Sequence, residues 1–279
     1  MILKTQAIVL NMVPFSETSR VVTWLTADHG RLATIIKGSQ RRKSRFLGQY
    51  DLFYTCELLF YLRLHQGVHI TRECSPLKPR LALRSQWRAM ACASYFAHLV
   101  ARISPPYAPH PELFHLLDKA LDAFAQEQNL EACLYWFELK IMTAMGLAPQ
   151  FHACLKCKRS LDARAEPAPG HRFSRTGEQP PASPFFSHTR GGVLCGVCAA
   201  TMGREAEKLA PDVLGLLRFW QQSRTWRSAR SSRCTARQLR ELERVLGRFL
   251  QYHLEVDPVN RELALQVMRH QFRPAESIP

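Results

Sequence analysis

The sequence has few residues that could neutralise its positive charge. It contains 23 Asp and Glu against 38 Lys and Arg, which gives a formal net charge of +15 over 279 residues. The shortage is greatest in two stretches, residues 31–50 and 213–240, which contain no carboxylate. Such a balance is unusual for an enzyme of small metabolites and favours anionic partners, above all nucleic acids.

Long apolar runs are also missing. The best candidate, residues 132–148, is interrupted by Glu138 and Lys140, whereas a membrane span needs roughly 18 to 20 uncharged apolar residues. Residues 1–15 alternate apolar and polar positions and lack the apolar centre of a secretory signal. We therefore expect a cytoplasmic protein without a membrane span.

Several catalytic signatures are absent as well. No glycine is followed by lysine, which excludes a Walker loop and its ATPase chemistry. A zinc-dependent base deaminase needs a Pro directly before a Cys-x-x-Cys, but Cys154 follows Ala153 and Cys195 follows Leu194. The acidic residues are scattered, so a metal-dependent nuclease is not indicated. These absences predict a protein that is not an enzyme.

The first part of the chain contains five β-like runs, at residues 4–13, 19–26, 31–37, 50–64 and 67–72. In the fourth run, alternate residues from Leu52 to Leu64 share one face, which we expect to be the core face, and Phe53 to Arg63 form the other. Short strands in so small a segment fit a closed barrel better than a sheet with open edges. We therefore predict a five-stranded OB-type β-barrel.

The third run leads directly into a basic loop, and residues 31–50 contain six Lys or Arg. The cations that we expect to bind DNA phosphates are Lys37, Arg41, Arg42, Lys43 and Arg45. OB barrels also stack bases on aromatic rings, and the rings near this loop are Phe46, Tyr50, Phe53 and Tyr61. The alternatives are a solvated loop without a ligand and rings that pack in the core.

After Pro79 the apolar period changes to three and four residues, which predicts amphipathic helices over residues 83–99, 113–124 and 130–146. The apolar stripe of the first helix is expected to include Trp87 and Ser94. Two more helices are expected at 211–222 and at 235–253, where Thr235 and Gln238 form a capping box. These patterns predict helix packing.

The segment 223–234, between these last two helices, is rich in Ser and Arg and is predicted to be a loop. Its arginines are secondary candidates for contacts with DNA or a partner: Arg224, Arg227, Arg230 and Arg233. Solvated surface is an equal alternative, because the cations are spread over several turns.

Two closely spaced cysteine pairs form the strongest chemical motif of the sequence. Cys154-Leu-Lys-Cys157 is followed, 38 positions after Cys157, by Cys195-Gly-Val-Cys198. The two-residue spacer lets both thiolates of a pair face one ion, and four thiolates complete the tetrahedral coordination of Zn²⁺. Because no position is left for water, we predict one structural zinc ion on Cys154, Cys157, Cys195 and Cys198.

Other uses of these cysteines remain open. The total of nine cysteines is odd, which indicates thiols rather than a disulfide framework. Redox pairs and an iron–sulfur cluster are alternatives. His152 and His188 lie nearby, although four thiolates do not need them. The Pro-rich arm 163–184 between the pairs is expected to bulge out or form a hairpin.

The predicted fold is therefore α+β with several domains: an OB-type barrel followed by an all-α domain that carries a Cys₄ zinc ribbon. The expected boundaries are 1–78 for the barrel, 79–150 for the first helical part, 151–202 for the ribbon insertion and 203–279 for the second helical part.

The chain also resembles the bacterial RecO family of recombination mediators, through motifs that occur in the same order. They are Ala7-Ile-Val-Leu10, Ser16-Glu-Thr-Ser19, Gly30-Arg-Leu, Lys37-Gly38, Ser44-Arg45, Trp136-Phe-Glu-Leu139, Met145-Gly146 and Gly191-Gly-Val-Leu-Cys-Gly-Val-Cys198. The sequence departs from the family in its long Pro-rich arm and at Asp257-Pro-Val-Asn-Arg261, which matches only loosely.

The resemblance implies an N-terminal OB domain, a helical domain and, in many members, a Cys₄ zinc site. It also implies binding of single- and double-stranded DNA, annealing of complementary strands and a nucleoid-associated location. The implied partners are RecR, the acidic tail of the single-strand binding protein and, indirectly, RecA and RecF. The alternative is a zinc-ribbon interaction module of transcription or translation that anneals nothing.

Overall fold

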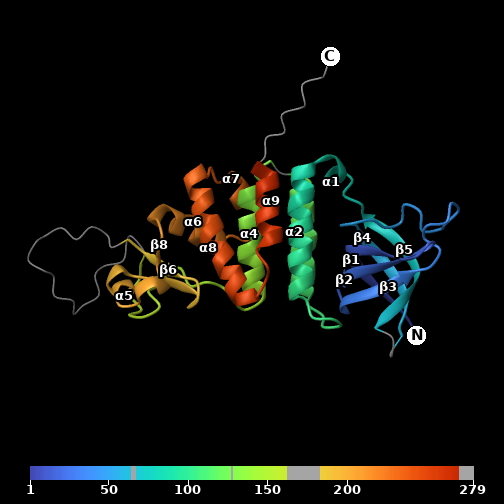
Figure 1. Ribbon diagram of the computed structural model, residues 1–279, viewed down its shortest axis with the longest axis horizontal. Coiled ribbons are helices and arrows are strands. Elements are labelled where there is room, and N and C mark those ends of the chain that lie inside the picture. The colour runs from blue at the N-terminus through green and yellow to red at the C-terminus, as the bar shows by residue number, and fades with distance from the viewer. Residues whose placement is uncertain (64–66, 127, 162–182, 270–279) are drawn as a thin grey trace, which may run out of the picture. The chain divides into compact units, whose positions relative to one another are not determined.

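The computed structural model describes residues 1–63, 67–126, 128–161 and 183–269 (Figure 1). The chain divides into two compact units, Met1–Leu130 with Val259–Pro279, and Glu131–Pro258. These two units do not test the predicted division into four parts, which therefore stays a prediction. Apart from Ser183 and Pro184, the Pro-rich arm lies outside the described residues. Within the described ranges, no helix has the length and hydropathy of a membrane span.

The first unit begins with the predicted barrel. Its strands are β1 (Ile2–Ser16), β2 (Ser19–Thr26), β3 (Gly30–Ile36), β4 (Thr55–Tyr61) and β5 (Val68–Lys78). They close in the order β1-β2-β3-β5-β4, with β1 paired to β4 and a parallel contact between β3 and β5. The closed five-stranded OB-type barrel is therefore confirmed.

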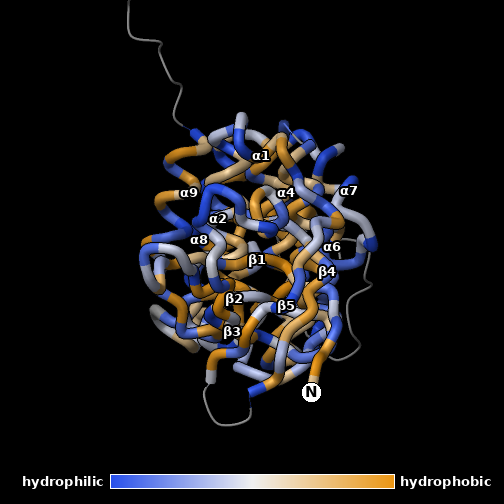
Figure 2. The backbone as a smooth tube through the Cα atoms, turned by 90° about the vertical axis from the view of Figure 1, so that its right-hand side faces the viewer, coloured by the Kyte–Doolittle hydropathy of each residue, from blue (hydrophilic) through white to orange (hydrophobic). Residues whose placement is uncertain are grey.

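The barrel core follows the alternation of the strands, and Figure 2 shows hydrophobic stretches running along them. Trp24 is fully buried, and its Nε1 donates a hydrogen bond of 2.8 Å to Oγ1 of Thr34. The Thr34 hydroxyl also shares a bond of 2.7 Å with that of Thr71. Because a buried indole N–H needs an acceptor, this chain of bonds fixes the orientation of the largest side chain in the barrel.

The prediction for the fourth strand was right at its centre and wrong at its start. Residues from Tyr54 to Phe60 alternate as expected, but β4 begins only at Thr55. Phe53 has a φ of 67°, which breaks the extended conformation. Strand alternation therefore does not apply before Thr55: Leu52 is 40 % exposed, whereas Phe53, placed on the outer face by the sequence, is buried.

The helices of the first unit are α1 (Ala82–Ser85), α2 (Trp87–Ile103), α3 (Pro111–Phe124) and α9 (Val259–Arg269). The chain leaves helical geometry at Gln86, so the first predicted helix is two helices. The predicted stripe was wrong at Trp87 and Ser94, which are exposed, because α2 packs against both α3 and α9 with other residues. Helix α9 was not predicted.

The second unit contains α4 (Leu130–Ala144), which starts one residue before the boundary, α6 (Pro211–Gln222), α7 (Arg227–Ser231) and α8 (Ala236–Leu254). The capping box of Thr235 and Gln238 is confirmed. The segment 223–234 is not all loop, because it contains α7. A small sheet in the order β7-β6-β8 joins β6 (Phe185–Ser187), β7 (Gly192–Leu194) and β8 (Glu207–Lys208).

An ion-pair network joins the barrel to α3. The Arg80 side chain, only 4 % exposed, donates to Oδ1 of Asp118 and Oδ1 of Asp122, both at 2.6 Å, and to the backbone oxygen of Phe53 at 2.7 Å. Burial acts to raise the pKa of Asp118. Hydrogen bonds from Lys78 and Thr55 and the charge of Arg80 outweigh burial, so this pKa lies below its ordinary value.

We expect Asp118→Asn to lower the free energy of unfolding by about 2 to 4 kcal/mol, because a nearly buried Arg80 loses part of its counter-charge. A lowered carboxyl pKa stabilises the folded state above the unfolded-state pKa and loses this effect as the pH falls. Wild-type stability should therefore drop below about pH 4, and the variant should lack this part of the dependence. Urea unfolding between about pH 7 and about pH 3 tests both.

Glu17→Gln is the matched control, since Glu17 lies exposed in the turn between β1 and β2. Equal stability of the two variants near neutral pH would show that the network contributes nothing.

Candidate functional site

The basic loop between β3 and β4 is held by consecutive turns. Backbone bonds run from Arg41 N to Gly38 O at 3.2 Å and from Ser44 N to Arg41 O at 3.0 Å. Gln40 N donates to Thr18 O at 3.0 Å, which ties the loop to the β1–β2 turn. Phe46 and Tyr50 are buried in the barrel core and anchor its far end. The loop is therefore a shaped surface and not only a solvated connection.

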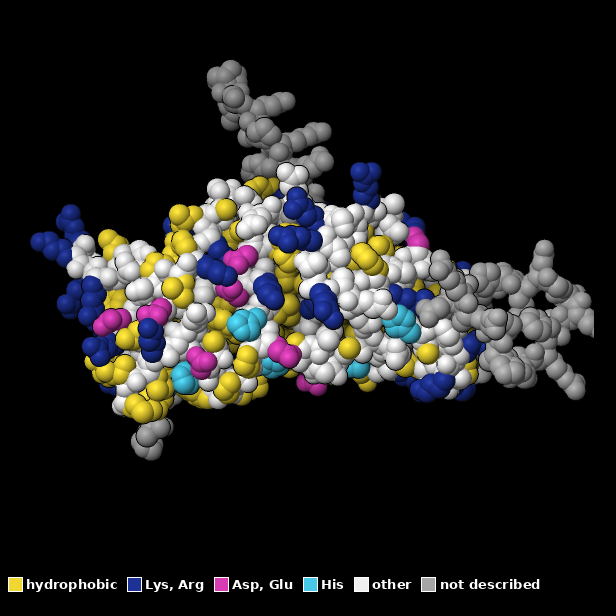
Figure 3. Space-filling view, turned by 180° about the vertical axis from the view of Figure 1, so that it is seen from behind, with side chains coloured by type: hydrophobic (Ala, Val, Ile, Leu, Met, Phe, Trp, Pro, Cys, Tyr) yellow, Lys and Arg dark blue, Asp and Glu magenta, His cyan; other side chains and the backbone are white. Residues whose placement is uncertain are grey.

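The loop cations differ in how freely they can meet a ligand. Lys37, Arg41, Arg42 and Lys43 are exposed, and their side chains make no ion pair or hydrogen bond with the described part of the chain. Arg45 is exposed too, but its Nη2 donates to the backbone oxygen of Arg72 at 2.7 Å and its guanidinium lies over the Phe46 ring. Figure 3 shows Lys and Arg side chains projecting from the barrel, at the left.

The aromatic candidates are mostly core residues. Phe46, Tyr50 and Phe53 are at most 9 % exposed, which leaves them no face for a base, whereas Tyr61 is 43 % exposed. Sequence reasoning missed Phe15, which is 61 % exposed and is the penultimate residue of β1, beside the turn that contacts the loop. The available signal was its position between the first two predicted strands, 4–13 and 19–26, outside the alternation that places a ring in the core.

The arginines of the second basic stretch differ in their surroundings. Arg224, Arg227, Arg230 and Arg233 are exposed around α7, and the Arg227 guanidinium lies 5.8 Å from the centre of the Trp226 ring. The flanking arginines are engaged: Arg218 Nε donates to the Phe151 oxygen at 2.8 Å, and Arg237 pairs with Asp212 and Glu241. The arginines of residues 224–233 remain candidates for contact with DNA or a partner.

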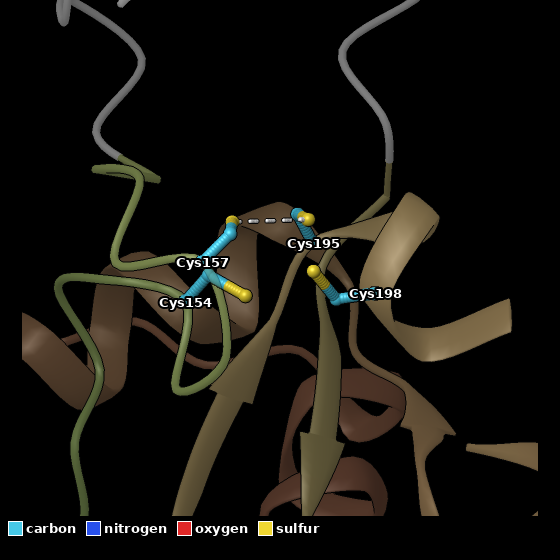
Figure 4. A group of neighbouring side chains, drawn as sticks. All are labelled: Cys154, Cys157, Cys195 and Cys198. Atoms are coloured by element: carbon cyan, nitrogen blue, oxygen red, sulfur yellow. Dashed lines mark hydrogen bonds between the residues drawn. The ribbon is translucent and has the colours of Figure 1, made fainter. Parts of the chain in front are cut away.

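The four cysteines of the two pairs come together, as predicted (Figure 4). Their Sγ atoms all lie within 4.8 Å of one another, and three of the four residues are buried. The Sγ atoms of Cys157 and Cys195 are 3.8 Å apart, which is about the edge of a tetrahedron with metal–sulfur bonds of roughly 2.3 Å. The donor set and its size fit one tetrahedral metal ion.

Local backbone structure orients each of the two cysteine pairs. Lys158, with a φ of 61°, turns the first knuckle so that its N–H bonds Cys154 O at 2.9 Å, and Leu155 N attaches the knuckle to Val193 O of β7. The second pair spans the end of β7 and the start of α5 (Gly196–Ala200). Lys156 Nζ donates to Oγ1 of Thr201 at 2.9 Å and so links the two knuckles.

The thiols of this cluster differ in acidity. Burial acts to raise the pKa of Cys154, but backbone N–H groups of Cys157, Cys195 and Lys156 outweigh it and bring this pKa to about 6. Burial and the neighbouring thiols raise the pKa of Cys198 to about 12. The surroundings therefore favour the charged form of Cys154 and oppose the charged form of Cys198. A metal cation that replaces the thiol protons would stabilise all four thiolates together.

The two nearby histidines do not belong to the cluster. His152 Nε2 lies 3.2 Å from Nε2 of Gln222, and the backbone oxygen of His188 lies 2.7 Å from Nε2 of His253. Neither is in the group of metal-binding side chains found in the described residues. The Cys₄ prediction is therefore confirmed as a cluster of potential ligands.

Comparison with known proteins agrees with this architecture. A family model described as "Recombination protein O N terminal" matches residues 1–80, and one described as "Recombination protein O C terminal" matches residues 84–262. Their junction falls between the barrel and α2.

Similar proteins extend over most of the chain. A DNA repair protein RecO of Anaeromyxobacter dehalogenans is 31 % identical over 251 residues, which cover 90 % of this chain and 91 % of that protein. Proteins of the same name from Roseiflexus and Dehalococcoides mccartyi are 28 % and 24 % identical, each over 91 % of this chain and over 82 % and 92 % of their own lengths. The chain belongs to the RecO family of DNA repair and recombination proteins.

Proposed function

We propose that this protein binds single- and double-stranded DNA and anneals complementary strands as a recombination mediator. Single strands lie across the barrel, and their phosphates contact Lys37, Arg41, Arg42, Lys43 and Arg45. The observation that carries the proposal is a set of four exposed cations, unpaired among the described residues, on a shaped loop of an OB-type barrel. OB barrels bind single strands by this combination of a cationic groove and exposed rings.

Phe15 and Tyr61 are the exposed rings of the barrel that can stack bases. Tyr61 is one of the four rings that the sequence suggested, and Phe15 takes the place of the three that are buried. The proposed strand therefore passes the β1–β2 turn and the basic loop, which a backbone hydrogen bond joins.

Annealing follows from charge. Two DNA strands repel each other, and a protein with a net charge of +15 lowers that repulsion when it holds both. The secondary arginines, Arg224, Arg227, Arg230 and Arg233, offer the second strand or a partner protein a positive surface. No covalent step is part of this function, so we propose that the protein is not an enzyme.

The partners follow from family membership and charge. We propose that the protein acts with RecR, and in some settings RecF, to help load RecA on strands covered by the single-strand binding protein. The acidic tail of the single-strand binding protein suits the positive surface. This role fits the cytoplasm and the nucleoid. The metal proposed for the Cys₄ cluster is Zn²⁺, in a structural role, because four thiolates fill its coordination sphere.

The experiment is an annealing assay with complementary oligonucleotides and no nucleotide. We expect the protein to speed pairing by about 10- to 1,000-fold at low salt, the range of electrostatic steering, and less as salt rises. Non-complementary strands are the control. If pairing is not faster than without protein, a zinc-ribbon interaction module becomes the better description.

A further inference from the structure

A pocket of about 480 Å³ lies inside the first unit, between the barrel wall and α2. Its walls come from the outer side of β1, β2 and β3, from the segment before β4 and from one face of α2. The volume falls within the roughly 300 to 1,000 Å³ of small-ligand sites. The basic loop does not line this pocket, so it is a separate feature of the barrel.

The lining of the pocket carries two positive charges, from Arg31 and Arg102, and none of the lining residues is a carboxylate. His98 lines the pocket beside Arg102 and adds a polar ring. Arg31 is held in place, because its Nε donates to the backbone oxygen of Ser104 at 2.9 Å. Its two Nη groups make no hydrogen bond with the described residues, so they are available to a ligand. These side chains can bind an anionic group such as a phosphate.

The inner wall of the pocket is apolar, and one of its residues has a strained backbone conformation. Leu10 and Phe53 are 8 % and 3 % exposed, and both line the cavity. Phe53 keeps its unusual φ of 67° because Val9 O accepts its N–H at 3.1 Å and Arg80 Nη1 bonds its oxygen at 2.7 Å. Strained backbone of a bulky residue persists only where the surroundings fix it, and it concentrates at ligand sites.

Strand β3 connects this pocket to the basic loop. Arg31 is the second residue of β3, and Lys37 directly follows its last residue. Between them the outward side chains are Ala33 and Ile35, half-buried and uncharged, beside Thr23 and Val21 of β2. Six residues of strand extend over roughly 20 Å. This is enough for several nucleotides, in keeping with the roughly 4 to 16 that one OB fold covers.

We propose that the pocket between the barrel and α2 holds one nucleotide of the bound single strand, at the end away from the basic loop. Its phosphate contacts Arg31 and Arg102, and its base packs against the apolar side chains of Leu10 and Leu52, which both line the pocket. The inference rests on the proposed binding of single strands and adds a second fixed point to it. An acidic peptide could use the same cations, but the pocket and the basic loop lie at the two ends of β3, a span that fits one single strand bound to an OB fold.

The test is the double variant His98→Ala with Arg102→Ala in the full-length protein. Both residues are exposed on α2, four positions apart. The matched control is His115→Ala with Lys119→Ala, an exposed pair with the same spacing on α3. Affinities for oligothymidylates of increasing length are measured by fluorescence anisotropy. We expect the α2 variant to bind long oligonucleotides about tenfold more weakly and short ones normally, because short ones occupy the loop alone.

Each outcome decides the proposal. Equal affinities of the α2 variant and the α3 control at every length overturn it, even if wild type binds DNA well. So does a variant that binds every oligonucleotide normally but loses affinity for an Asp- and Glu-rich peptide, since the pocket then holds peptide. If wild type binds no oligonucleotide at all, the proposed function itself fails.

Discussion

Replacing Arg41, Arg42 and Lys43 together with Ala should weaken single-strand binding roughly 10- to 100-fold near 0.1 M salt. The three side chains are exposed and unpaired within the described chain, so each is free to contact a phosphate. An exposed ion pair contributes up to about 1 kcal/mol, and three such contacts give this range. The loss concerns charge and not fold, because the residues that anchor the loop are Phe46 and Tyr50.

The salt dependence gives a sharper readout than affinity alone. Each phosphate contact on a single strand contributes about 0.7 to the slope of log affinity against log salt. Wild type, with four or five loop contacts, should show a slope near −3 from the loop, and the triple variant should be shallower by about 2. The measurement is a titration of one oligothymidylate at several salt concentrations.

Two further variants separate charge from position. Exchanging the cation type, with Arg41→Lys, Arg42→Lys and Lys43→Arg, keeps the charge and should keep the slope. Replacing Arg224, Arg227 and Arg233 with Ala removes the same charge around α7. If that variant loses the slope and the loop variant does not, the primary strand site lies around α7 and the assignment to the barrel is wrong.

The sequence predicted those features that depend on local periodicity or spacing. The barrel strands follow a period of two, the helix at Pro211–Gln222 follows a period of three and four, and the Cys₄ cluster follows from two Cys-x-x-Cys spacers. The strand and helix patterns repeat within one element, and each Cys-x-x-Cys spacer is local, although the cluster joins two such pairs that lie 38 positions apart.

The sequence failed where a distant backbone atom decides what a side chain does. Arg31 and Arg45 count as equal members of the basic stretch, yet each donates to a carbonyl far along the chain, at Ser104 and at Arg72. The conformation of Phe53 depends on Arg80. The return of α9 to pack on α2 and the pocket beneath α2 likewise join residues that no local pattern relates.

Loss of the metal should have the largest effect on stability, confined to the second unit. All four thiols belong to Glu131–Pro258, and the sheet they adjoin has strands of only two or three residues. Its core is a small cluster around Leu194 and the thiols themselves. Zinc binding to small structural sites contributes about 10 to 16 kcal/mol, comparable with the roughly 5 to 15 kcal/mol that stabilises a whole domain.

Cys154→Ser should therefore abolish metal binding and unfold the ribbon around β6 and β7. Elemental analysis of the purified protein should give about one metal ion per wild-type chain and almost none for the variant, and should distinguish zinc from iron. The variant should be cut by protease within the ribbon, whereas the barrel should remain intact and bind single strands with an unchanged salt slope, since none of the ligands lies in the first unit.

Cys234→Ser is the matched control, because Cys234 is a half-buried thiol of the same unit outside the cluster. It should keep its metal and its resistance to protease. A chelator should convert wild type to the behaviour of the Cys154 variant, and added Zn²⁺ should reverse this. If Cys154→Ser keeps a full complement of metal and melts with Cys234→Ser, the four thiols do not form a metal site, and redox chemistry of the pairs becomes the explanation to pursue.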